Sequence, residues 1–490
     1  MKESLESSSV DAIIQKALLA AHAFGKLDQE QTDRITRAVY EAGFNNRWKL
    51  AEMAHKETGL GIVHDKMVKN IIATRFVYKD IIGQKTVGVV SKDDDSMITE
   101  IARPMGPIFA VTPITNPTST ALFKILIAMK TRNPIMIYPH GAARKCTIEA
   151  ARICYEAALE AGAPENCIQW IPRASRDQVL AFMSHPRTSL VLATGSVSLV
   201  RAAYSSGNPA IGVGPGNVPV YIGKTADVPF AVDQILVSKL FDNGTICASE
   251  QSVVVSRYNA KKVREEFVKQ GGYFLSKDEI DKVGKIAINT AQKSMSPEVI
   301  GQPPEVIARL AGITIPAGIR LLLAHLEPTQ VGLKWPLSLE ILAPILAYYE
   351  VDEFDDAIIL CKRINEHGGL GHTVSIFSND SAKIHYFAHT LNAGRIVVNT
   401  PSSQGAVGGL YNSLNPSLTL ACGSGGKNFT TDNISVRHLL NIQRIAYRKI
   451  KVCAEHQKGE SFCCDKSLTI DEIDLACETA KSEQRKGISE

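Results

Sequence analysis

The chain has 490 residues, of which 45% are hydrophobic and 21% charged, a composition typical of a folded protein with two or three domains. Its formal net charge of +4 is small for this length, so neither nucleic acid nor an anionic membrane is expected as a partner. It contains no apolar run of about 18 residues, and its first residues lack the apolar core of a secretory signal. The ten cysteines are therefore expected to be reduced thiols in the cytoplasm.

The first hundred residues predict helices followed by a hairpin. Residues 10–24 carry apolar side chains at helical spacing, and similar patterns continue to about residue 80. Residues 86–105 contain two strand-like runs on either side of a polar turn, which predicts a β-hairpin.

Strand and helix patterns alternate from residue 106 onward. Buried strands are predicted at residues 108–111, 134–138, 167–171 and 190–193, and helices at residues 119–130, 142–161, 176–183 and 196–203. This alternation predicts a parallel, doubly wound α/β sheet, which binds ligands at the carboxyl ends of its strands. A less regular alternation from residue 247 to about residue 395 predicts a second α/β domain.

The candidate nucleophile is Cys247. Asn243-Gly244 is a turn signal, and residues 252–255 have the pattern of a buried strand, so Cys247 lies where a loop enters a strand. A thiol there can attack a carbonyl carbon, and neighbouring backbone N–H groups can stabilise the oxyanion that forms. The alternative is that Cys247 is a small buried core residue, as most intracellular cysteines are.

Two strand–helix connections are candidates for a nucleotide site. The Gly-x-Gly-x-x-Gly fingerprint of dinucleotide-binding domains is absent. Residues 194–196 and 112–117 each follow a strand and open a helix, whose N–H groups can hold an anion. An ordinary strand–helix connection would have the same pattern.

Residues 239–251 resemble the active-site segment of the aldehyde dehydrogenase superfamily, and most closely that of its CoA-acylating branch, including the N-terminal half of the bifunctional aldehyde–alcohol dehydrogenases. Further matching segments follow in the same order, up to about residue 445, at residues 201–207, 371–373, 396–401 and 421–424. The resemblance implies an α/β fold with two doubly wound parallel-sheet domains and a small dimerisation hairpin. It implies the following domains: residues 1–239 for nucleotide binding, with the hairpin at about 86–105, 240–420 for the catalytic cysteine, 421–448 as a return segment to the first domain, and 449–490 as an appended tail.

The resemblance also gives a role to each candidate residue. Cys247 would be the nucleophile, Asn116 would help to hold the carbonyl oxygen, and His372 would assist thiol transfer or line the CoA pocket. Glu340 would hold the nicotinamide ribose. The residues implied in binding NAD or NADP are Thr112, His140, Thr194, Gly195, Ser196, Gly214 and Glu340.

The implied reaction is the conversion of an aldehyde, CoA and NAD(P)⁺ to acyl-CoA and NAD(P)H through a thioester on the cysteine. Hydrolytic members use a glutamate to activate water, but the matching segment here, residues 212–215, has glycine in its place. Without that base, the CoA thiol is the natural acceptor of the acyl group. The alternatives are a water-using enzyme with another base and a non-catalytic scaffold subunit of the same fold.

The substrate pocket departs from the resembling enzymes at residues 423–426, where Gly425 replaces a bulky ring and Lys427 follows. A larger space and a nearby cation would suit an anionic aldehyde, such as succinate semialdehyde or sulfoacetaldehyde, and these are narrowly favoured over acetaldehyde. The alternative is that Lys427 is a solvated surface lysine. The resemblance implies a homodimer or a larger homo-oligomer.

The appended tail carries possible zinc ligands at Cys453, His456, Cys463 and Cys464. Adjacent cysteines are poor geometry for one tetrahedral site, so no metal is expected. A disordered extension, or a helix that docks on a partner, are the alternatives. The iron-dependent alcohol dehydrogenase half of the bifunctional enzymes has no counterpart in this sequence, and alcohol production is not expected.

Overall fold

The computed structural model describes residues 9–289 and 294–447, together with residues 469, 471, 472, 475 and 478. The four possible zinc ligands of the tail lie outside these described residues. The chain forms two compact units, one of Met1–Thr86 with Pro104–Leu440 and the other of Val87–Arg103 with Asn441–Glu490.

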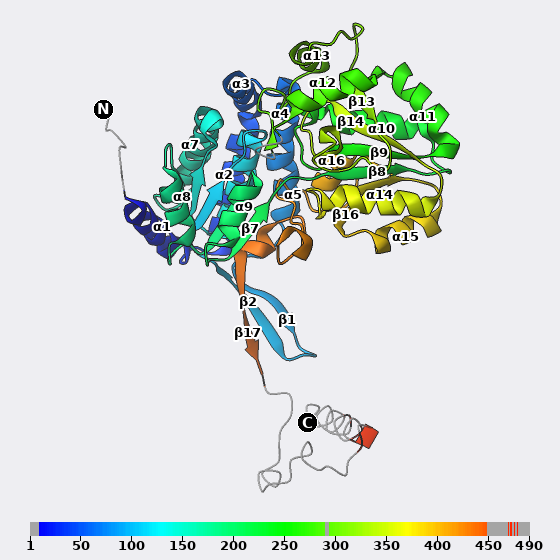
Figure 1. The fold of residues 1–490 in the computed structure, drawn as a ribbon. Coiled ribbons are helices and arrows are strands. Elements are labelled where there is room, and N and C mark those ends of the chain that lie inside the picture. Colours follow the sequence, from blue (N-terminus) through cyan, green and yellow to red (C-terminus); the bar gives the residue numbers. More distant parts are fainter. Residues whose placement is uncertain are drawn as a thin grey trace. The chain divides into compact units, whose positions relative to one another are not determined.

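Five parallel strands form the first sheet, with β3 at its centre (Figure 1). The strands are β3 (Ile108–Val111), β4 (Ile135–Tyr138), β5 (Ile168–Trp170), β6 (Leu190–Thr194) and β7 (Ala210–Val213). The connecting helices are α6 (Pro117–Lys130), α7 (Arg144–Glu160), α8 (Arg176–Ser184) and α9 (Val197–Tyr204). The chain runs outward from β3 to β5 and then crosses to β6 on the other side of β3. This reversal makes a topological switch point between the carboxyl ends of β3 and β6, where such sheets bind ligands.

Seven parallel strands form the second sheet, in the order β10-β13-β14-β9-β8-β15-β16. The strands are β8 (Val218–Ile222), β9 (Glu250–Ser256), β10 (Gly272–Phe274), β13 (Leu321–His325), β14 (Ile345–Val351), β15 (Gly371–Phe377) and β16 (Ala393–Val398). The helices of this part are α10 (Val228–Leu240), α11 (Arg257–Lys269), α12 (Lys277–Ala287), α13 (Pro304–Ala311), α14 (Phe354–Glu366), α15 (Ser381–Thr390) and α16 (Ser402–Val407). Every residue of β9 is buried, because the sheet is covered on both faces, and this explains its continuous apolar run.

The predicted doubly wound fold is confirmed in both sheets. The strand β3 has the predicted bounds, and α6 begins two residues before its predicted start. The strand β8 and the helix α10 precede the predicted boundary at residue 240, yet they pack with β9 in one hydrophobic core. The periodicity of an apolar strand shows that it is buried, but it does not show which sheet the strand joins.

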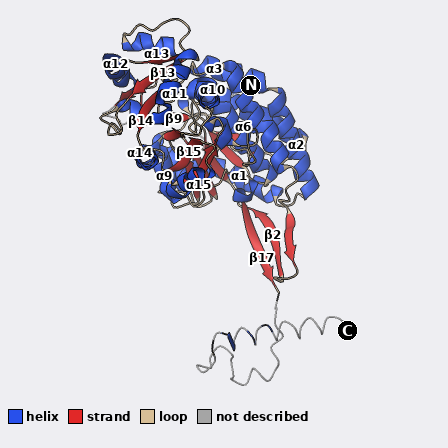
Figure 2. Ribbon diagram, turned by 90° about the vertical axis from the view of Figure 1, so that its right-hand side faces the viewer, coloured by secondary structure: helices blue, strands red, loops and turns tan. Residues whose placement is uncertain are grey.

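The N-terminal helices pack on the helices that connect the strands of the first sheet: α2 contacts α6 and α7, and Figure 2 shows α2 beside α6. They are α1 (Val10–Phe24), α2 (Gln29–Asn45), α3 (Arg47–Thr58), α4 (Val63–Ile71) and α5 (Val77–Ile81), with the π-helical turn η1 (Ile72–Phe76) between α4 and α5. The helix α4 contacts both α6 and the short helix η3 (Phe241–Gly244), which directly precedes the cysteine turn. It therefore connects the helix that follows β3 with the segment of the candidate nucleophile.

The second unit contains a three-stranded sheet of β1 (Gly88–Asp93), β2 (Ile98–Pro104) and β17 (Leu440–Ala446). The strands β1 and β2 pair antiparallel, which confirms the predicted hairpin. The third strand, β17, was not predicted, because the sequence analysis assigned residues 421–448 only as a return segment. Arg444 and Glu100 form an ion pair of 2.9 Å between β17 and β2. The role of this sheet in a dimer stays a prediction.

The remaining short elements of the chain are mostly single helical turns. They are η2 (Gly141–Ala143), η4 (Pro336–Ser338), η5 (Ser424–Gly426), η6 (Val436–Leu439) and the paired strands β11 (Ile288–Asn289) and β12 (Ser294–Met295). Within the described residues, no helix is both long and apolar enough to cross a membrane. The same residues contain no cluster of three His, Cys, Asp or Glu side chains that could hold a metal ion.

Candidate active site

Cys247 lies in a tight turn between η3 and β9. Asp242, Asn243 and Gly244 all have positive φ angles, of 49°, 52° and 74°. Gly244 packs so closely on Ala343 that a Cβ atom there would lie 3.0 Å from the Ala343 carbonyl oxygen. Among the cysteines in the described part of the chain, Cys247 alone is partly exposed, and the others are buried. The turn therefore presents this one thiol to a substrate, which favours the catalytic over the core interpretation.

The electrostatic surroundings hold Cys247 in the thiol form. Burial raises the pKa of its thiol to about 12, Glu340 and Cys422 raise the pKa further, and Arg395 lowers it. Its backbone N–H donates to no other residue in the described part of the chain and interacts only with the cysteine's own sulfur, where it lowers the pKa. That N–H is available to an oxygen atom bound at the cysteine.

Asn116 lies at the N-cap of α6 but does not cap the helix with its side chain. An asparagine at this position usually accepts a helix N–H bond, which is worth about 1 kcal/mol. Here its Oδ1 instead accepts a 2.6 Å bond from Lys69 Nζ, and its Nδ2 donates to the Thr245 carbonyl oxygen at 3.3 Å and to Thr115 Oγ1 at 3.1 Å. The asparagine thus contacts the turn two residues before Cys247, which brings the two predicted catalytic residues together.

A buried charge cluster that the sequence analysis missed supports this turn. Lys66 and Lys69 on α4 both donate to Oδ2 of Asp242, at 2.9 and 2.5 Å. The other oxygen of Asp242 accepts the N–H of Ile62 at 2.6 Å. All three charged side chains are at most 3% exposed. The signal in the sequence was two lysines three residues apart in an amphipathic helix, which is also the pattern of a solvated helix face.

Gly216 brings three of the predicted site residues together. A Cβ atom on Gly216 would lie 2.3 Å from the Cys247 carbonyl oxygen and 3.2 Å from the His372 ring. Its N–H donates a 2.8 Å bond to Oε1 of Glu340. Burial raises the pKa of Glu340 to about 7, although the Gly216 N–H and Lys239 lower it. Only glycine allows the cysteine turn, the histidine and the glutamate to meet around this backbone.

His372 is a neutral, fully buried imidazole. Burial, with Arg395 as the second cause, lowers its pKa to about 3. Its Nδ1 lies 2.9 Å from Thr373 Oγ1, whereas its Nε2 has no partner among the described residues. Arg395, which the sequence analysis did not single out, donates to the carbonyl oxygens of His372 and Ala421 at 2.6 and 2.8 Å. An unpartnered ring nitrogen in a buried site is able to exchange a proton with a reacting thiol.

The position of the missing general base has no room for a side chain. A Cβ atom on Gly212 would lie 2.6 Å from Val200 Cγ1 and 3.0 Å from the Tyr204 ring. The hydroxyl of Tyr204 donates to the Gly212 carbonyl oxygen at 2.8 Å, which locks this backbone against α9. A glutamate at residue 212 would therefore have to displace α9.

All of the residues predicted to bind the nucleotide except Glu340 lie at the carboxyl edge of the first sheet. Thr112 and Gly214 directly follow β3 and β7, His140 lies two residues after β4, and Thr194 ends β6 and is followed by Gly195 and Ser196. Ser196 is exposed and its side chain caps α9 by accepting the Leu199 N–H, and a Cβ atom on Gly214 would meet no atom within 4 Å. The open space beside Gly214 and the exposed start of α9 fit a bound dinucleotide.

A buried lysine holds the two central strands of this edge. Lys124 Nζ donates to the carbonyl oxygens of Val111 and Leu192, at 2.7 and 2.9 Å, and to Thr194 Oγ1 at 3.1 Å. Burial lowers the pKa of Lys124 to about 7. Lys124, on the helix α6, thus joins β3 to β6 at the topological switch point.

Lys427 is exposed, and no hydrogen bond or ion pair of the described residues joins its side chain to another predicted site residue. It has a left-handed φ of 64° after η5, and no ion pair of the described residues includes it. The loop that carries Lys427 contacts the site through the next residue, Asn428, whose Nδ2 donates to the Gly212 carbonyl oxygen at 3.2 Å. A Cβ atom on Gly425 would lie 3.0 Å from Leu370 Cγ, so Leu370 limits the space left by the missing ring.

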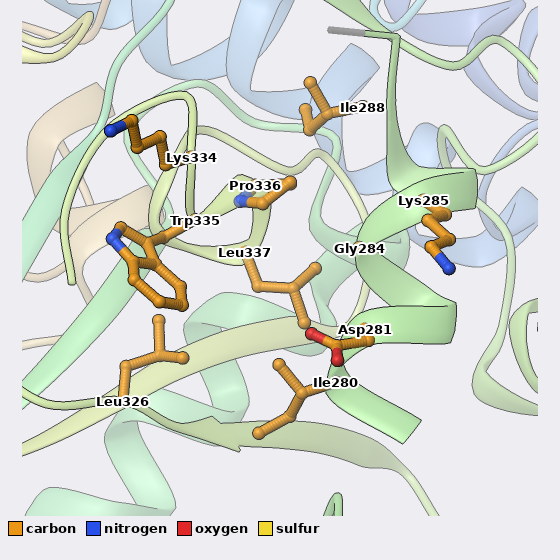
Figure 3. Close-up of a pocket in the computed structure, with 10 residues that line it drawn as sticks. All are labelled: Ile280, Asp281, Gly284, Lys285, Ile288, Leu326, Lys334, Trp335, Pro336 and Leu337. Atoms are coloured by element: carbon orange, nitrogen blue, oxygen red, sulfur yellow. The ribbon is translucent and has the colours of Figure 1, made fainter. Parts of the chain in front are cut away.

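A separate cavity of about 300 Å³ lies in the part of the chain that carries the second sheet (Figure 3). It is lined by residues of α12 and η4, with Trp335 and Leu326 facing its apolar part. No predicted site residue lines it. The cavity is thus distinct from the cysteine site.

Comparison with known proteins gives one consistent family. A model of the aldehyde dehydrogenase family matches residues 3–294 and 337–416. The bifunctional aldehyde-alcohol dehydrogenase AdhE of Escherichia coli is 44% identical over 90% of this chain. The match covers 50% of that relative, so the chain spans about half its length.

Other relatives match over most of their own length. The succinate-semialdehyde dehydrogenase (acetylating) of Clostridium kluyveri is 33% identical over 90% of this chain and 96% of the relative. A sulfoacetaldehyde dehydrogenase of an Acholeplasma species is 33% identical, over 88% of this chain and 89% of the relative.

Solved structures share the fold. An acetylating aldehyde dehydrogenase from Geobacillus thermoglucosidasius matches with a TM-score of 0.87 and 44% identity, over 90% of this chain and 97% of the other. A propionaldehyde dehydrogenase from Rhodopseudomonas palustris, with bound CoA and an acylated cysteine, matches with a TM-score of 0.78 and 25% identity, over 90% and 97%. An engineered glycolyl-CoA reductase with bound NADP⁺ matches with a TM-score of 0.78 and 26% identity, over 90% and 96%. The family model, which matches well over half of the chain, and these relatives show that the chain belongs to the aldehyde dehydrogenase family.

Proposed function

We propose that this chain is a CoA-acylating aldehyde dehydrogenase that converts an aldehyde, CoA and NAD(P)⁺ to acyl-CoA and NAD(P)H. The observation that carries this proposal is the lack of room for a water-activating base at Gly212, together with a partly exposed thiol at Cys247. The relatives with acylating names, which match over nearly their whole length, support the same reaction.

The first half of the reaction forms a thioester on Cys247. The Cys247 thiol would give its proton to the neutral His372 ring, which releases it to solvent, and the sulfur adds to the aldehyde carbon so that the carbonyl oxygen becomes an oxyanion. Collapse of this oxyanion expels a hydride from the same carbon and leaves the thioester on Cys247. The Cys247 N–H and Nδ2 of Asn116 are the donors placed to hold that oxygen. The nicotinamide ring of a bound NAD(P)⁺ supplies the hydride acceptor. Glu340, on the Gly216 N–H, is placed to hold the ribose next to this ring.

The second half transfers the acyl group to CoA. The CoA sulfur attacks the thioester carbon, the Cys247 sulfur leaves as a thiolate, and the thiol proton of CoA must move to a base. Nε2 of His372, which has no partner among the described residues, would take that proton and pass it to solvent. Because burial lowers the pKa of the ring to about 3, His372 would carry the proton only transiently. A thiol is a far better nucleophile toward a thioester than water, so no further activation is needed.

The start of α7 favours NAD⁺ over NADP⁺ as the cofactor. The carboxylate of Glu57 accepts the N–H groups of Lys145 and Cys146, at 2.8 and 2.7 Å, close to His140 where the adenosine ribose is expected. A carboxylate there already uses the helix N-terminus that would otherwise hold a 2′-phosphate, and it repels that phosphate.

We expect CoA-dependent formation of NADH from short aldehydes. Purified protein would be incubated with acetaldehyde, succinate semialdehyde or sulfoacetaldehyde, with NAD⁺ or NADP⁺, and with or without CoA, and absorbance of the reduced nicotinamide would be followed. Sustained turnover should require CoA and be faster with NAD⁺. Equal sustained rates without CoA would contradict the acylating assignment.

We propose a short aldehyde as the substrate, with only a weak preference for an anionic one. An ion pair with an exposed lysine is worth up to about 1 kcal/mol, which corresponds to a factor of about five. Lys427 is exposed, so it cannot supply a larger preference. The relatives of 44% identity are aldehyde-alcohol and acetylating aldehyde dehydrogenases, whereas those named for anionic aldehydes are 33% identical.

Lys427→Ala tests whether Lys427 gives the enzyme a weak preference for anionic aldehydes. We expect KM for succinate semialdehyde to rise about three- to fivefold, in line with one exposed ion pair, and KM for acetaldehyde to stay within twofold. Lys334→Ala, which removes an exposed lysine of the separate cavity, is the matched control and should change neither value. Equal KM changes for both aldehydes would exclude a charge contact between Lys427 and the substrate.

A further inference from the structure

One ammonium group joins the two segments that carry the candidate catalytic residues. Nζ of Lys69 donates to Asn116 Oδ1 at 2.6 Å, to Asp242 Oδ2 at 2.5 Å and to Thr245 Oγ1 at 2.8 Å. Asn116 follows β3 in the first sheet, whereas Asp242 and Thr245 belong to the turn before Cys247. Lys69 itself comes from a third segment, the helix α4.

These contacts determine which way the Asn116 amide points. An ammonium group only donates hydrogen bonds, so the atom that faces Lys69 must be the accepting Oδ1. The donating Nδ2 then lies on the other side, toward the Thr245 carbonyl oxygen. The bonds from Nδ2 measure 3.1 and 3.3 Å, against 2.6 Å from Lys69, so Oδ1 is the held end and Nδ2 is the end that can change partners.

Stability does not explain this arrangement. Two buried lysines share a single carboxylate. Burial lowers the pKa of Lys69 to about 8; Asp242 raises this pKa and Lys66 lowers it. Asp65, which accepts the N–H of Asp242 at 2.8 Å, is the further charge nearby. Apolar side chains of similar volume often stabilise a protein more than such buried ions do.

We propose that Lys69 is a positioning residue, which holds Oδ1 of Asn116 so that Nδ2 faces the carbonyl oxygen bound at Cys247. The inference rests on the proposed function and extends it to a residue outside the reacting groups. The positive charge on Oδ1 also polarises the amide, which makes its N–H a stronger donor to the oxyanion. Lys69 thus acts on the reaction through Asn116 and not by touching the substrate.

The test compares Lys69→Met with Lys66→Met in the full-length chain. Both variants remove one buried ammonium from Asp242, but Lys66 donates its second bond to the Thr115 carbonyl oxygen and not to Asn116. Loss of an oxyanion donor costs about 10²- to 10³-fold in kcat. Lys69→Met is therefore expected to lower kcat about 10- to 100-fold with KM within threefold, and Lys66→Met to stay within about threefold of the unmodified chain in kcat.

A double variant separates positioning from a general structural effect. Asn116→Ala alone should lower kcat about 10²- to 10³-fold. If Lys69 acts through Asn116, then Lys69→Met added to Asn116→Ala should change kcat by less than about twofold. The proposal would be overturned if the loss of kcat in the double variant were the product of the two single losses. It would also be overturned if Lys69→Met and Lys66→Met lowered kcat equally.

Asn116→Asp gives a second test that does not depend on how the lysine variants fold. A carboxylate can accept the bond from Lys69 as Oδ1 does, although its second oxygen cannot donate to the Thr245 carbonyl oxygen, so the variant should unfold at a higher temperature than Asn116→Ala, which loses both contacts. The variant has no N–H to donate and should be as slow as Asn116→Ala. An unfolding temperature below that of Asn116→Ala would show that Oδ1 does not face Lys69, and would overturn the proposal.

The outcomes also separate this proposal from the function on which it rests. If the unmodified chain forms no NADH with any aldehyde in the presence of CoA, the proposed function fails, and the role of Lys69 in it fails as well. If the unmodified chain is active and Lys69→Met has the same kcat, only the role of Lys69 is wrong.

Discussion

Cys247→Ala is expected to lower kcat/KM for aldehyde oxidation by about 10⁵-fold or more, because the variant has no atom that can form the thioester. The unmodified chain, given aldehyde and NAD⁺ without CoA, should release about one equivalent of NADH per site and keep the acyl group on Cys247. Stopped-flow absorbance measures the first value, and mass spectrometry of the intact protein measures the second. The variant should show neither.

Cys422→Ala is the matched control for this experiment. Cys422 is buried, and its thiol raises the pKa of Cys247 and is itself influenced by Arg395, so it shares the electrostatic surroundings of the nucleophile. Because Cys422 has no access to substrate, its removal should change kcat/KM by less than about tenfold and leave the acyl adduct in place. Retention of more than about one per cent of the activity in Cys247→Ala would contradict a covalent role for Cys247.

Asp242→Asn is expected to destabilise the protein by about 3–5 kcal/mol, the usual cost of removing one partner from a buried ionic cluster. Asparagine keeps the shape of the side chain and tolerates the φ of 49°, so the change isolates the charge. Lys66 and Lys69 would then face a neutral amide while almost fully buried. Urea denaturation, monitored by circular dichroism, gives the free energy of unfolding.

The stability lost in Asp242→Asn should be larger at low pH than at high pH. Burial lowers the pKa of Lys69 in the folded protein to about 8, below its value in the unfolded chain, so the unfolded state binds more protons between these two values. Stability therefore rises with pH in this window, and the destabilisation should be larger at pH 6.5 than at pH 9. Without Asp242 the folded pKa falls further, which increases this difference.

Two companion variants check the origin of the effect. Lys66→Met combined with Asp242→Asn removes one of the two uncompensated charges and should recover part of the lost stability. Asp65→Asn changes a partly exposed carboxylate that accepts the N–H of Asp242 at 2.8 Å and lies 3.5 Å from His64 Nδ1, and it should cost less than Asp242→Asn. Equal losses for both aspartate variants would show that the ionic cluster is not what supports the turn.

The sequence alone determined the fold class and indicated a candidate nucleophile. Alternating strand and helix periods favour parallel strands joined by helices, because each period specifies which faces are buried, and both sheets have this form. Cys247 was singled out because it lies between a turn signal and a buried strand, and because residues 239–251 resemble the active-site segment of the aldehyde dehydrogenases. The hairpin at residues 86–105 followed from two short alternating runs around a polar turn.

Only the tertiary structure decided which distant residues meet at the site. Gly216 brings Cys247, His372 and Glu340 together, although these positions are separated by up to 156 residues in sequence (372 − 216 = 156). The lysines of α4 reach Asp242 across more than 170 residues, and in the sequence they are indistinguishable from a solvated helix face. Periodicity reports burial and local geometry, but the partner of a buried charge is set by how the segments pack. For that reason the sequence indicated Asn116 and Cys247 separately, and the structure alone showed that Lys69 connects them.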